Sequence, residues 1–538
     1  MISRRALIGA TTAAALAALR PSHARAETPK RGGKLALRLW DPPHWDPYLT
    51  PAFRTQVPYS FTHSRLIKHK AGPAVLPGTF EFEGDLAESW SQPDELTYVF
   101  KLHRGVRFQP KPPVNGRELT AADVVYSMER FRSVKGNPQA YLLAMVDKVT
   151  ALDRHTVQCT LKEPYAWFLD MIASPMTLPI VARECVEKFG DLKKAEATVG
   201  TGPWMLERYR PNVGFTLVRH PHYFRSGLPL IDRIEVTIDE DNASRLAAFL
   251  AGKYDLGWEN GGAINRTDWN AMREPLKRHR PGLRTAEHPS NVVYRVFMRT
   301  DKAPFSDVRV RRAISMAINR NALIDAVADG SGWLNGAVPL ALGDWGLAVE
   351  HMGDAQPYYR HNPKEAQKLL AEAGHPGGFA TVMDFNNYGS SFMDDAIALV
   401  LRDLKSVGID AKLNRKEYGA YIATTATGNY EGMYYGATPF LDPDSSLYTN
   451  FAPGHPRNVA KVNDPVLTDL LVRQRHTADP TARRGLIHDI QRHAALQQYI
   501  IELYSPVTVF VWNGALKNYG PNLGYDYGGR LVAAWLDR

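Results

Sequence analysis

The sequence of 538 residues contains only two cysteines, Cys159 and Cys185. A disulfide framework of the kind that holds small secreted domains together is therefore excluded. Cys159 lies in a segment where Val157, Cys159 and Leu161 alternate with polar residues, which predicts a strand with the thiol on its apolar face. We expect a buried free thiol, and a Cys159–Cys185 bridge is the alternative.

Long apolar runs and blocks of like charge are also missing. After residue 26 no segment free of charges reaches the roughly 20 residues that a membrane-spanning helix needs. The net charge is +9, but residues 1–26 hold four arginines and no acidic residue, which leaves 61 Lys and Arg against 56 Asp and Glu. With no run of five like charges, this mildly basic surface argues against a nucleic-acid-binding protein.

Motifs of common enzyme classes are absent as well. The sequence has no G-x-S-x-G elbow, no H-E-x-x-H pair and no G-x-x-x-x-G-K-[ST] phosphate loop. The closest histidine pairs, His220/His222 and His63/His69, have no cysteine or carboxylate at ligand spacing. We therefore predict no catalytic residue, no metal site and no cofactor.

The amino terminus has the pattern of an export signal. Arg4 and Arg5 precede the apolar stretch Ala6–Leu19, and Ala24-Arg25-Ala26 follows as a cleavage site. We predict a cleaved signal peptide over residues 1–26. The paired arginines favour twin-arginine export, with the general secretory route as the alternative. Because no cysteine lies near the cleavage site, we expect a soluble periplasmic protein and not a lipoprotein.

Two features predict the fold class. The chain is too long for one core, which stops growing at roughly 250–300 residues, so two or three domains are expected. Strand Ala380–Asp384, helix Asp394–Val407 and strand Ile409–Leu413 form one βαβ unit, and helix Tyr418–Thr427 with strand Gly432–Gly436 forms the next. This pattern predicts α/β architecture with a largely parallel sheet.

Several helix starts are marked by capping residues. Thr120 is followed three positions later by Asp123, Asn362 is followed by Pro363, and Ser306 precedes an apolar periodic segment. Each pattern predicts a helix that begins just after the named cap.

A ligand site is expected where strands end, because ligands of open α/β sheets bind beyond the carboxyl ends of the strands. Loops there combine aromatic rings with amides, hydroxyls or carboxylates, a mixture that suits a polar organic ligand. Ordinary polar loops with one packed ring each are the alternative. The predicted ligand-binding residues are Trp258, Glu259, Asn260, Phe385, Asn386, Asn387, Tyr388, Tyr435, Thr438, Phe440 and Asp442.

Many segments resemble one known family. They run in family order along the chain: Leu86–Trp90, Leu96–Leu102, Gly105–Phe108, Leu119–Ser127, Gly200–Trp204, Phe305–Ile314, Asn362–Gly374 and Asp442–Asp444. In these segments the chain closely resembles the peptide/nickel-type solute-binding proteins of ABC transporters, family 5. The resemblance implies a monomeric, non-enzymatic protein that delivers a small polar solute, such as a peptide, an opine or a sugar-like molecule, to an ABC permease in the inner membrane.

The same resemblance implies the type II two-lobed periplasmic binding protein fold, with the extra subdomain of the peptide-binding group. The implied ranges are 27–60, 200–288 and 506–538 for the first lobe, 61–199 for the extra subdomain and 289–505 for the second lobe.

The sequence departs from the dipeptide-binding members of this family at both positions where those members bind the charged ends of the peptide. Pro439 stands where their carboxylate for the peptide amine is found, and Asn386, Asn387 and Tyr388 fill the loop that carries their arginine. Losing both charged partners argues against a free dipeptide as ligand. The alternatives are a nickel or metal-chelate ligand, as in the nickel branch of the family, and a secreted hydrolase that uses carboxylates such as Glu259 and Asp442.

Overall fold

A computed structural model describes residues 28–239, 241–258, 266–388 and 391–538. The predicted signal peptide, Glu259 and Asn260 lie outside these residues. Within them, no helix is both long and apolar enough to cross a membrane. The bounds of the two lobes and the extra subdomain stay a prediction, and we use them below as names.

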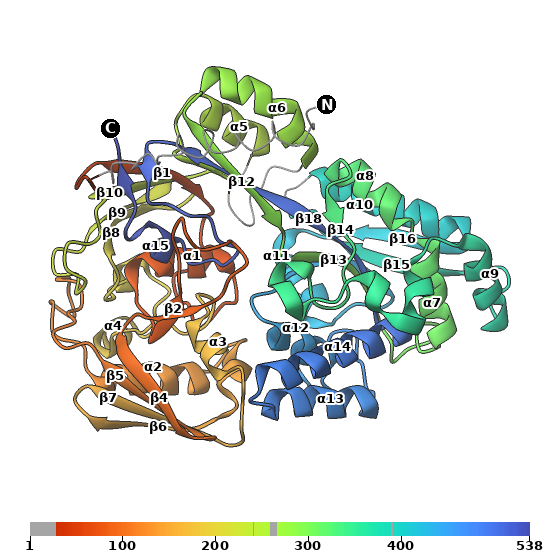
Figure 1. Cartoon of the computed structure of the whole chain (residues 1–538), viewed down its shortest axis with the longest axis horizontal. Coiled ribbons are helices and arrows are strands. Elements are labelled where there is room, and N and C mark those ends of the chain that lie inside the picture. Colours follow the sequence, from red (N-terminus) through yellow and green to blue (C-terminus); the bar gives the residue numbers. More distant parts are fainter. Residues whose placement is uncertain (1–27, 240, 259–265, 389–390) are drawn as a thin grey trace, which may run out of the picture. The chain divides into compact units, whose positions relative to one another are not determined.

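The first lobe contains a four-stranded sheet (Figure 1). Its order is β1 (Lys34–Leu39), β10 (Arg233–Ile238), β9 (Gly214–Arg219) and β8 (Trp204–Arg210). β1 is parallel to β10, and the other pairs are antiparallel. Helices assigned to this lobe are α1 (Phe53–Thr62), α5 (Asn242–Leu250), α6 (Arg266–His279) and α15 (Tyr527–Leu531).

The extra subdomain has its own antiparallel sheet, ordered β4 (Ala87–Asp94), β5 (Thr97–Leu102), β7 (Thr156–Leu161) and β6 (Val146–Asp153). Its helices are α2 (Ala121–Ser133), α3 (Phe168–Ala173) and α4 (Arg183–Phe189), and a short hairpin joins β2 (Ile67–His69) to β3 (Phe82–Gly84).

The second lobe is built on β13 (Val292–Met298), β17 (Met433–Pro439), β15 (Phe379–Phe385) and β16 (Ile409–Arg415), in that order. β15 pairs in parallel with both β16 and β17, as the βαβ pattern predicts. β13, however, is antiparallel to β17 and to β18 (Ile500–Asn513). The predicted largely parallel sheet is therefore wrong, because β13 and β18 enter the sheet as links to the first lobe and not through crossover helices.

The helices of the second lobe lie between β13 and β18 in the sequence. They are α7 (Val308–Ala317), α8 (Arg320–Ala328), α9 (Pro363–Glu372), α10 (Ser391–Ser406), α11 (Tyr418–Ala423), α12 (Pro443–Phe451), α13 (Pro465–His476) and α14 (Pro480–Gln497).

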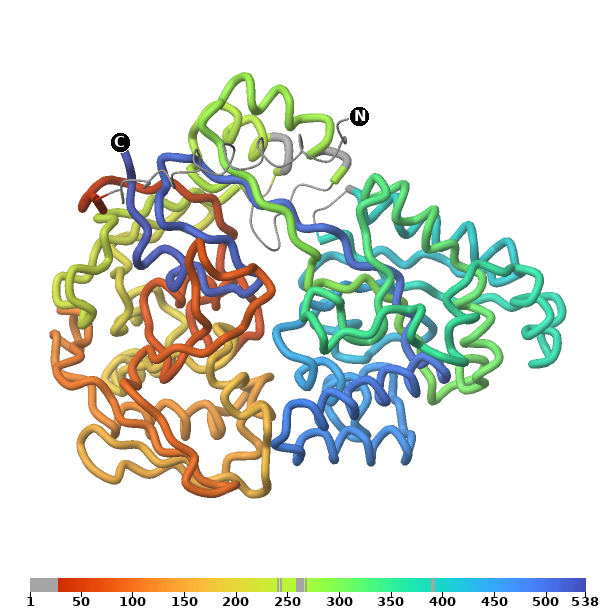
Figure 2. Tube along the Cα trace, viewed as in Figure 1, coloured from red at the N-terminus to blue at the C-terminus, as the bar shows by residue number. Residues whose placement is uncertain are grey.

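Two strands carry the chain between the lobes. One end of β18 pairs with β13 of the second lobe, and the other end pairs with β12 (Leu283–Pro289) of the first. The first-lobe end also pairs with β11 (Leu256–Trp258). Figure 2 shows β12 and β18 running side by side from one lobe to the other. Motion of the lobes relative to each other must therefore bend this short ribbon.

The predicted helix caps are confirmed at two of three positions. Thr120 and Asp123 form a capping box at the start of α2, and the Asn362 side chain accepts a hydrogen bond from the backbone at the start of α9. The cap of α7 is Asp307, not Ser306, since the Asp307 carboxylate accepts from the Arg309 amide at 2.8 Å. The Ser306 amide instead donates to Lys302 in the preceding turn.

Both cysteines are free and buried, and burial raises the pKa of each thiol to about 12. Thiolate, the reactive form, is therefore suppressed at neutral pH. We expect a maleimide reagent to modify neither cysteine in the folded protein and both after unfolding in guanidinium chloride, as counted by mass spectrometry. Protection that persists in guanidinium without a reductant would indicate a disulfide and contradict this expectation.

Candidate functional site

Tyr388 is the most exposed of the residues that the structure describes in the loop after β15. Asn386 is buried, donates to the Lys416 carbonyl at 2.9 Å and accepts from the Tyr388 amide at 2.7 Å. Asn387 donates to Asp394 at 2.8 Å. Tyr388 has a φ of 50° and is 37% exposed. The two asparagines therefore shape the loop, and among its described residues Tyr388 is the exposed one.

Tyr388 belongs to a cluster of rings on the second lobe. It contacts Tyr418 and Tyr421 edge-on, each at 5.7 Å between centroids. The Tyr418 ring also lies 5.3 Å from the guanidinium carbon of Arg54, which comes from α1 of the first lobe. This cation–π contact places α1 opposite the ring cluster.

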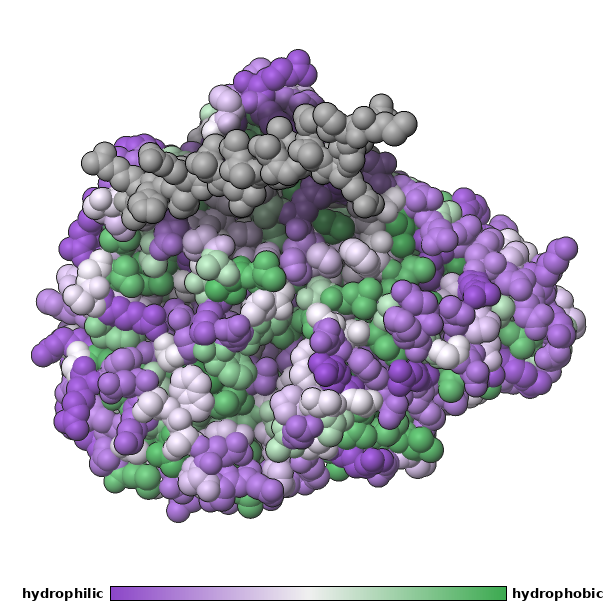
Figure 3. All heavy atoms as spheres, viewed as in Figure 1, coloured by the Kyte–Doolittle hydropathy of each residue, from purple (hydrophilic) through white to green (hydrophobic). Residues whose placement is uncertain are grey.

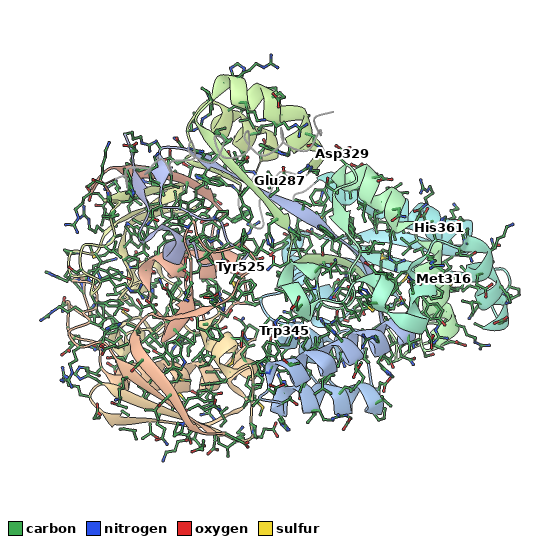
Figure 4. All side chains as sticks on the ribbon, viewed as in Figure 1. Glu287, Met316, Asp329, Trp345, His361 and Tyr525 are labelled. Carbon is green, nitrogen blue, oxygen red and sulfur yellow. The ribbon has the colours of Figure 1, made fainter. Side chains whose placement is uncertain are left out.

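The first lobe contributes aromatic side chains to the same junction. Phe53 contacts Trp40 edge-on at 4.9 Å and stacks on Tyr525 at 6.0 Å. Figure 4 labels Tyr525 on the side of the first lobe that faces the second. In Figure 3 hydrophobic patches run across the middle of the face in view, while the outer flanks are mostly hydrophilic. Aromatic side chains on both sides of a junction suit the apolar part of an organic ligand.

Other predicted residues have their side chains in the second-lobe interior. Phe385 and Tyr435 are fully buried, with 5.9 Å between their ring centroids. Phe440 is also fully buried, 4.5 Å from the Arg295 guanidinium, and its carbonyl accepts from Asn291 at 2.6 Å. These three rings hold the sheet and its loop in place, and their contact with a ligand stays a prediction.

Thr438 lies within β17 and not in a loop after it. The strand continues to Pro439, opposite Val292 of β13, whereas the sequence pattern ended it at Gly436. The full-length pairing with β13 explains the longer strand. Trp258 is the last residue of β11, paired opposite Val511.

Asp442 is the N-cap of α12 and accepts from the Ser445 amide at 2.6 Å. It is 9% exposed. Burial, and next the negative charge of Asp444, raise the pKa of Asp442 to about 6. A carboxyl group with this pKa changes charge in the physiological range.

Sequence reasoning missed a polar contact that joins the lobes near Asp442. From the extra subdomain, the Tyr165 hydroxyl donates to Asp444 at 2.9 Å and the Trp167 indole donates to Gln474 at 2.7 Å. Arg475 donates to both oxygens of Asp444 at 2.8–3.0 Å. We call these five side chains the interlobe contact. The motif Asp442-Pro443-Asp444 marked one side of it, but nothing in the sequence indicated its partners.

Aromatic contacts extend the interlobe contact. Trp167 meets Trp345 of the second lobe edge-on at 5.1 Å, and the Arg483 guanidinium lies 4.6 Å from the Trp167 ring. Figure 4 shows Trp345 at this junction. Glu163 and His476 add an exposed pair at 3.5 Å. The two lobes therefore meet through specific contacts away from the β12–β18 ribbon.

The described residues contain no group of three His, Cys, Asp or Glu side chains arranged to hold a metal ion. The arrangement that they do show consists of two lobes, linked by crossing strands, whose facing surfaces carry rings, amides and charged groups.

Comparison with known proteins identifies this arrangement. Residues 81–458 match the family described as "Bacterial extracellular solute-binding proteins, family 5 Middle". The chain belongs to this family. The prediction of a solute-binding protein of the ABC-importer type is thereby confirmed in preference to a secreted hydrolase.

Individual relatives bind chemically diverse solutes. Heme-binding protein A of Haemophilus influenzae is 29% identical, over 72% of this chain and 70% of its own. Glutathione-binding protein GsiB of Salmonella choleraesuis is 27% identical, over 69% of each chain.

Solved structures confirm the two-lobed α/β fold. DppA of Helicobacter pylori, in complex with the peptide STSA, superposes with a TM-score of 0.81 at 24% identity, over 95% of this chain and 99% of its own. AgaA of A. tumefaciens R10, in complex with agropinic acid, gives 0.80 at 23% identity, over 94% of this chain and 99% of its own.

Proposed function

We propose that this chain is a periplasmic binding protein that captures a peptide or another small polar solute between its lobes, releases it unchanged and delivers it to an ABC permease. The observation that carries the proposal is the pair of facing, ring-bearing surfaces on two lobes whose chain crossings are the strands β12 and β18. Ligand that touches both surfaces binds the closed state better than an open one and so shifts the population toward closure. The relatives that bind glutathione, a peptide and agropinic acid support a polar organic solute.

The proposed site combines predicted residues with residues that the structure adds. From the prediction we keep Trp258, Glu259, Asn260, Asn387, Tyr388, Thr438 and Asp442. From the structure we add Phe53, Arg54, Tyr418 and Tyr525, because they line the same junction. Asn386, Phe385, Tyr435 and Phe440 are assigned supporting roles.

The proposal also includes the periplasmic location of the protein and the release of the solute without a chemical reaction. Members of this family act on the extracellular side of the membrane. We propose that residues 1–26 direct export to the periplasm and are then removed.

Tyr388 offers a direct test of the site. We expect Tyr388→Ala to weaken solute binding at least tenfold, since removing a ring that the solute covers loses about 1.5–3 kcal/mol of apolar contact. The measurement is calorimetry with whichever member of a panel of glutathione, tri- to pentapeptides and opines binds the wild type. Trp333→Ala is the matched control, because Trp333 is an exposed ring (44%) on β14 (Gly332–Trp333).

Equal affinity of wild type and Tyr388→Ala would place the site elsewhere. Recovery of the solute unchanged after incubation supports binding without chemistry, whereas a product would support the hydrolase alternative.

We also expect no submicromolar affinity for a mixture of free dipeptides, since the family's charged partners for them are replaced by Pro439 and by the Asn386–Tyr388 loop.

A further inference from the structure

A backbone hydrogen bond adds to the interlobe contact. The Ala166 amide donates to the Arg475 carbonyl at 2.8 Å, and Ala166 lies between Tyr165 and Trp167, whose side chains make two of the polar contacts described above. Arg475 is in the last turn of α13, where backbone carbonyls have no partner within the helix. Three consecutive residues of the extra subdomain therefore bond to the second lobe, which fixes one against the other.

The segment that carries these residues is fixed to its own subdomain. Trp167 directly precedes α3, and the Phe168 ring of α3 lies 4.6 Å from Tyr98 of β5. On the other side, Asp444 and Gln474 belong to α12 and α13 of the second lobe. Both sides are parts of regular structure, so separating the lobes breaks the hydrogen bonds of the contact together.

The contact is buried and its polar groups bond to one another. The side chains of Tyr165, Trp167, Asp444 and Gln474 are all buried, and the Arg475 guanidinium lies 4.8 Å from the Tyr165 ring. A solute therefore does not touch these four side chains while the lobes are together. Any effect of the contact on solute binding must act through the closed state.

The strength of the contact suits a bias toward closure. When the lobes separate, water hydrates the exposed donors and acceptors, so the net gain from each hydrogen bond is small. One such bond changes the ratio of closed to open molecules about 2- to 12-fold. Several together favour closure, yet the lobes can still open for a solute to enter.

We propose that Tyr165 and Trp167 are positioning residues that favour the closed state before a solute binds, and thereby raise the affinity for every solute by the same factor. This inference rests on the proposed function for its effect on affinity. Apparent affinity is proportional to the fraction of molecules in the binding-competent state. Residues that touch the solute discriminate among solutes, whereas the interlobe contact acts on all of them equally.

The closed fraction is measured without any solute. Fluorescent dyes are attached through Leu152→Cys on β6 and Val466→Cys on α13, because both side chains are exposed, at 53% and 59%. The two native cysteines are buried, so the dyes react at the new positions. Single-molecule energy transfer between the dyes then separates open from closed molecules.

The variants are Tyr165→Phe, Trp167→Phe and the two combined. Each removes one hydrogen-bond donor and keeps a ring in place. Tyr209→Phe is the matched control, because the Tyr209 hydroxyl donates to Asp41 at 2.7 Å within the first lobe. The control loses a comparable hydrogen bond to a carboxylate, but one that does not cross between the lobes.

We expect each single variant to lower the closed-to-open ratio about 2- to 12-fold and the combined variant to lower it further. Calorimetry with glutathione, tri- to pentapeptides and opines should show that every compound that binds the wild type loses affinity by one common factor. That factor should equal the fold loss of the closed fraction. Tyr209→Phe should keep the closed fraction and the affinities of the wild type.

An unchanged closed-to-open ratio in the combined variant would overturn the inference and leave the proposed function standing. Affinities that fall for some compounds and not for others would also overturn it, because Tyr165 or Trp167 would then contact the solute. If no compound binds the wild type, the proposed solute class fails, and the energy-transfer comparison alone decides whether the interlobe contact favours closure.

Discussion

Replacing Asp444 by alanine is expected to lower the free energy of unfolding by about 3–5 kcal/mol, the cost of removing one partner from a buried ion pair. The Asp444 side chain is fully buried, and the change removes the acceptor of Tyr165, Gln474 and Arg475 together. Arg475 would keep its positive charge, 15% exposed, between aromatic rings and without a carboxylate. Equilibrium denaturation in urea measures the change.

Two further variants serve as comparisons for the loss of stability expected in Asp444→Ala. Asp344→Ala removes an exposed carboxylate (86%) that pairs with Arg484, and such pairs contribute about 0–1 kcal/mol. Tyr165→Phe removes only one of the hydrogen bonds that cross to the second lobe, and we expect a cost of about 1 kcal/mol. If Asp444→Ala were no less stable than Asp344→Ala, the interlobe contact would contribute nothing to the fold.

The stability of the wild type should fall relative to Asp442→Asn as the pH rises through about 6. The folded-state pKa of Asp442 is raised from 3.8 to about 6 by burial and by the neighbouring charge of Asp444. The raised pKa of Asp442 therefore adds its full amount to the free energy of unfolding below pH 3.8. This amount is lost as the pH rises and the carboxyl group ionises in the folded protein. Asparagine keeps an oxygen for the Ser445 amide but does not ionise.

Between pH 4 and 7.5 we expect the difference in unfolding free energy between Asp442→Asn and wild type to grow by up to roughly 3 kcal/mol in favour of the variant, at 1.36 kcal/mol for each pKa unit. Asp479→Asn is the matched control, because Asp479 is the exposed N-cap of α14. Parallel stability curves for wild type and Asp442→Asn would contradict the assigned pKa.

Local patterns in the sequence predicted most of the local structure. The capping residues Thr120 and Asn362 mark real helix starts, and the strand–helix–strand pattern around Asp394–Val407 predicted the parallel pair β15–β16. These features depend on residues a few positions apart, so their signal is contained in the sequence. The direction of β13 depends on where the chain crosses between lobes, and no short pattern indicates that.

The candidate site was harder to predict for the same reason. The strand-end rule selected Tyr388 and Asp442, but it also selected Phe385 and Tyr435, which are fully buried. An alternating strand does not reveal which of its faces is covered by helices. The hydrogen bond from Tyr165 to Asp444 joins residues 279 positions apart, and a contact of that kind leaves no periodic trace in the sequence.

The pairing of β18 with both lobes constrains the order in which the protein can be assembled. The first lobe receives β18, β20 (Trp535–Leu536) and α15 from the last 39 residues, and Arg538 donates to Asp255 and to the Lys34 carbonyl. A nascent chain that has emerged only as far as residue 288 still lacks these partners. Synthesis from the amino terminus therefore cannot complete the first lobe before the second, so both must mature together after translation has passed residue 500.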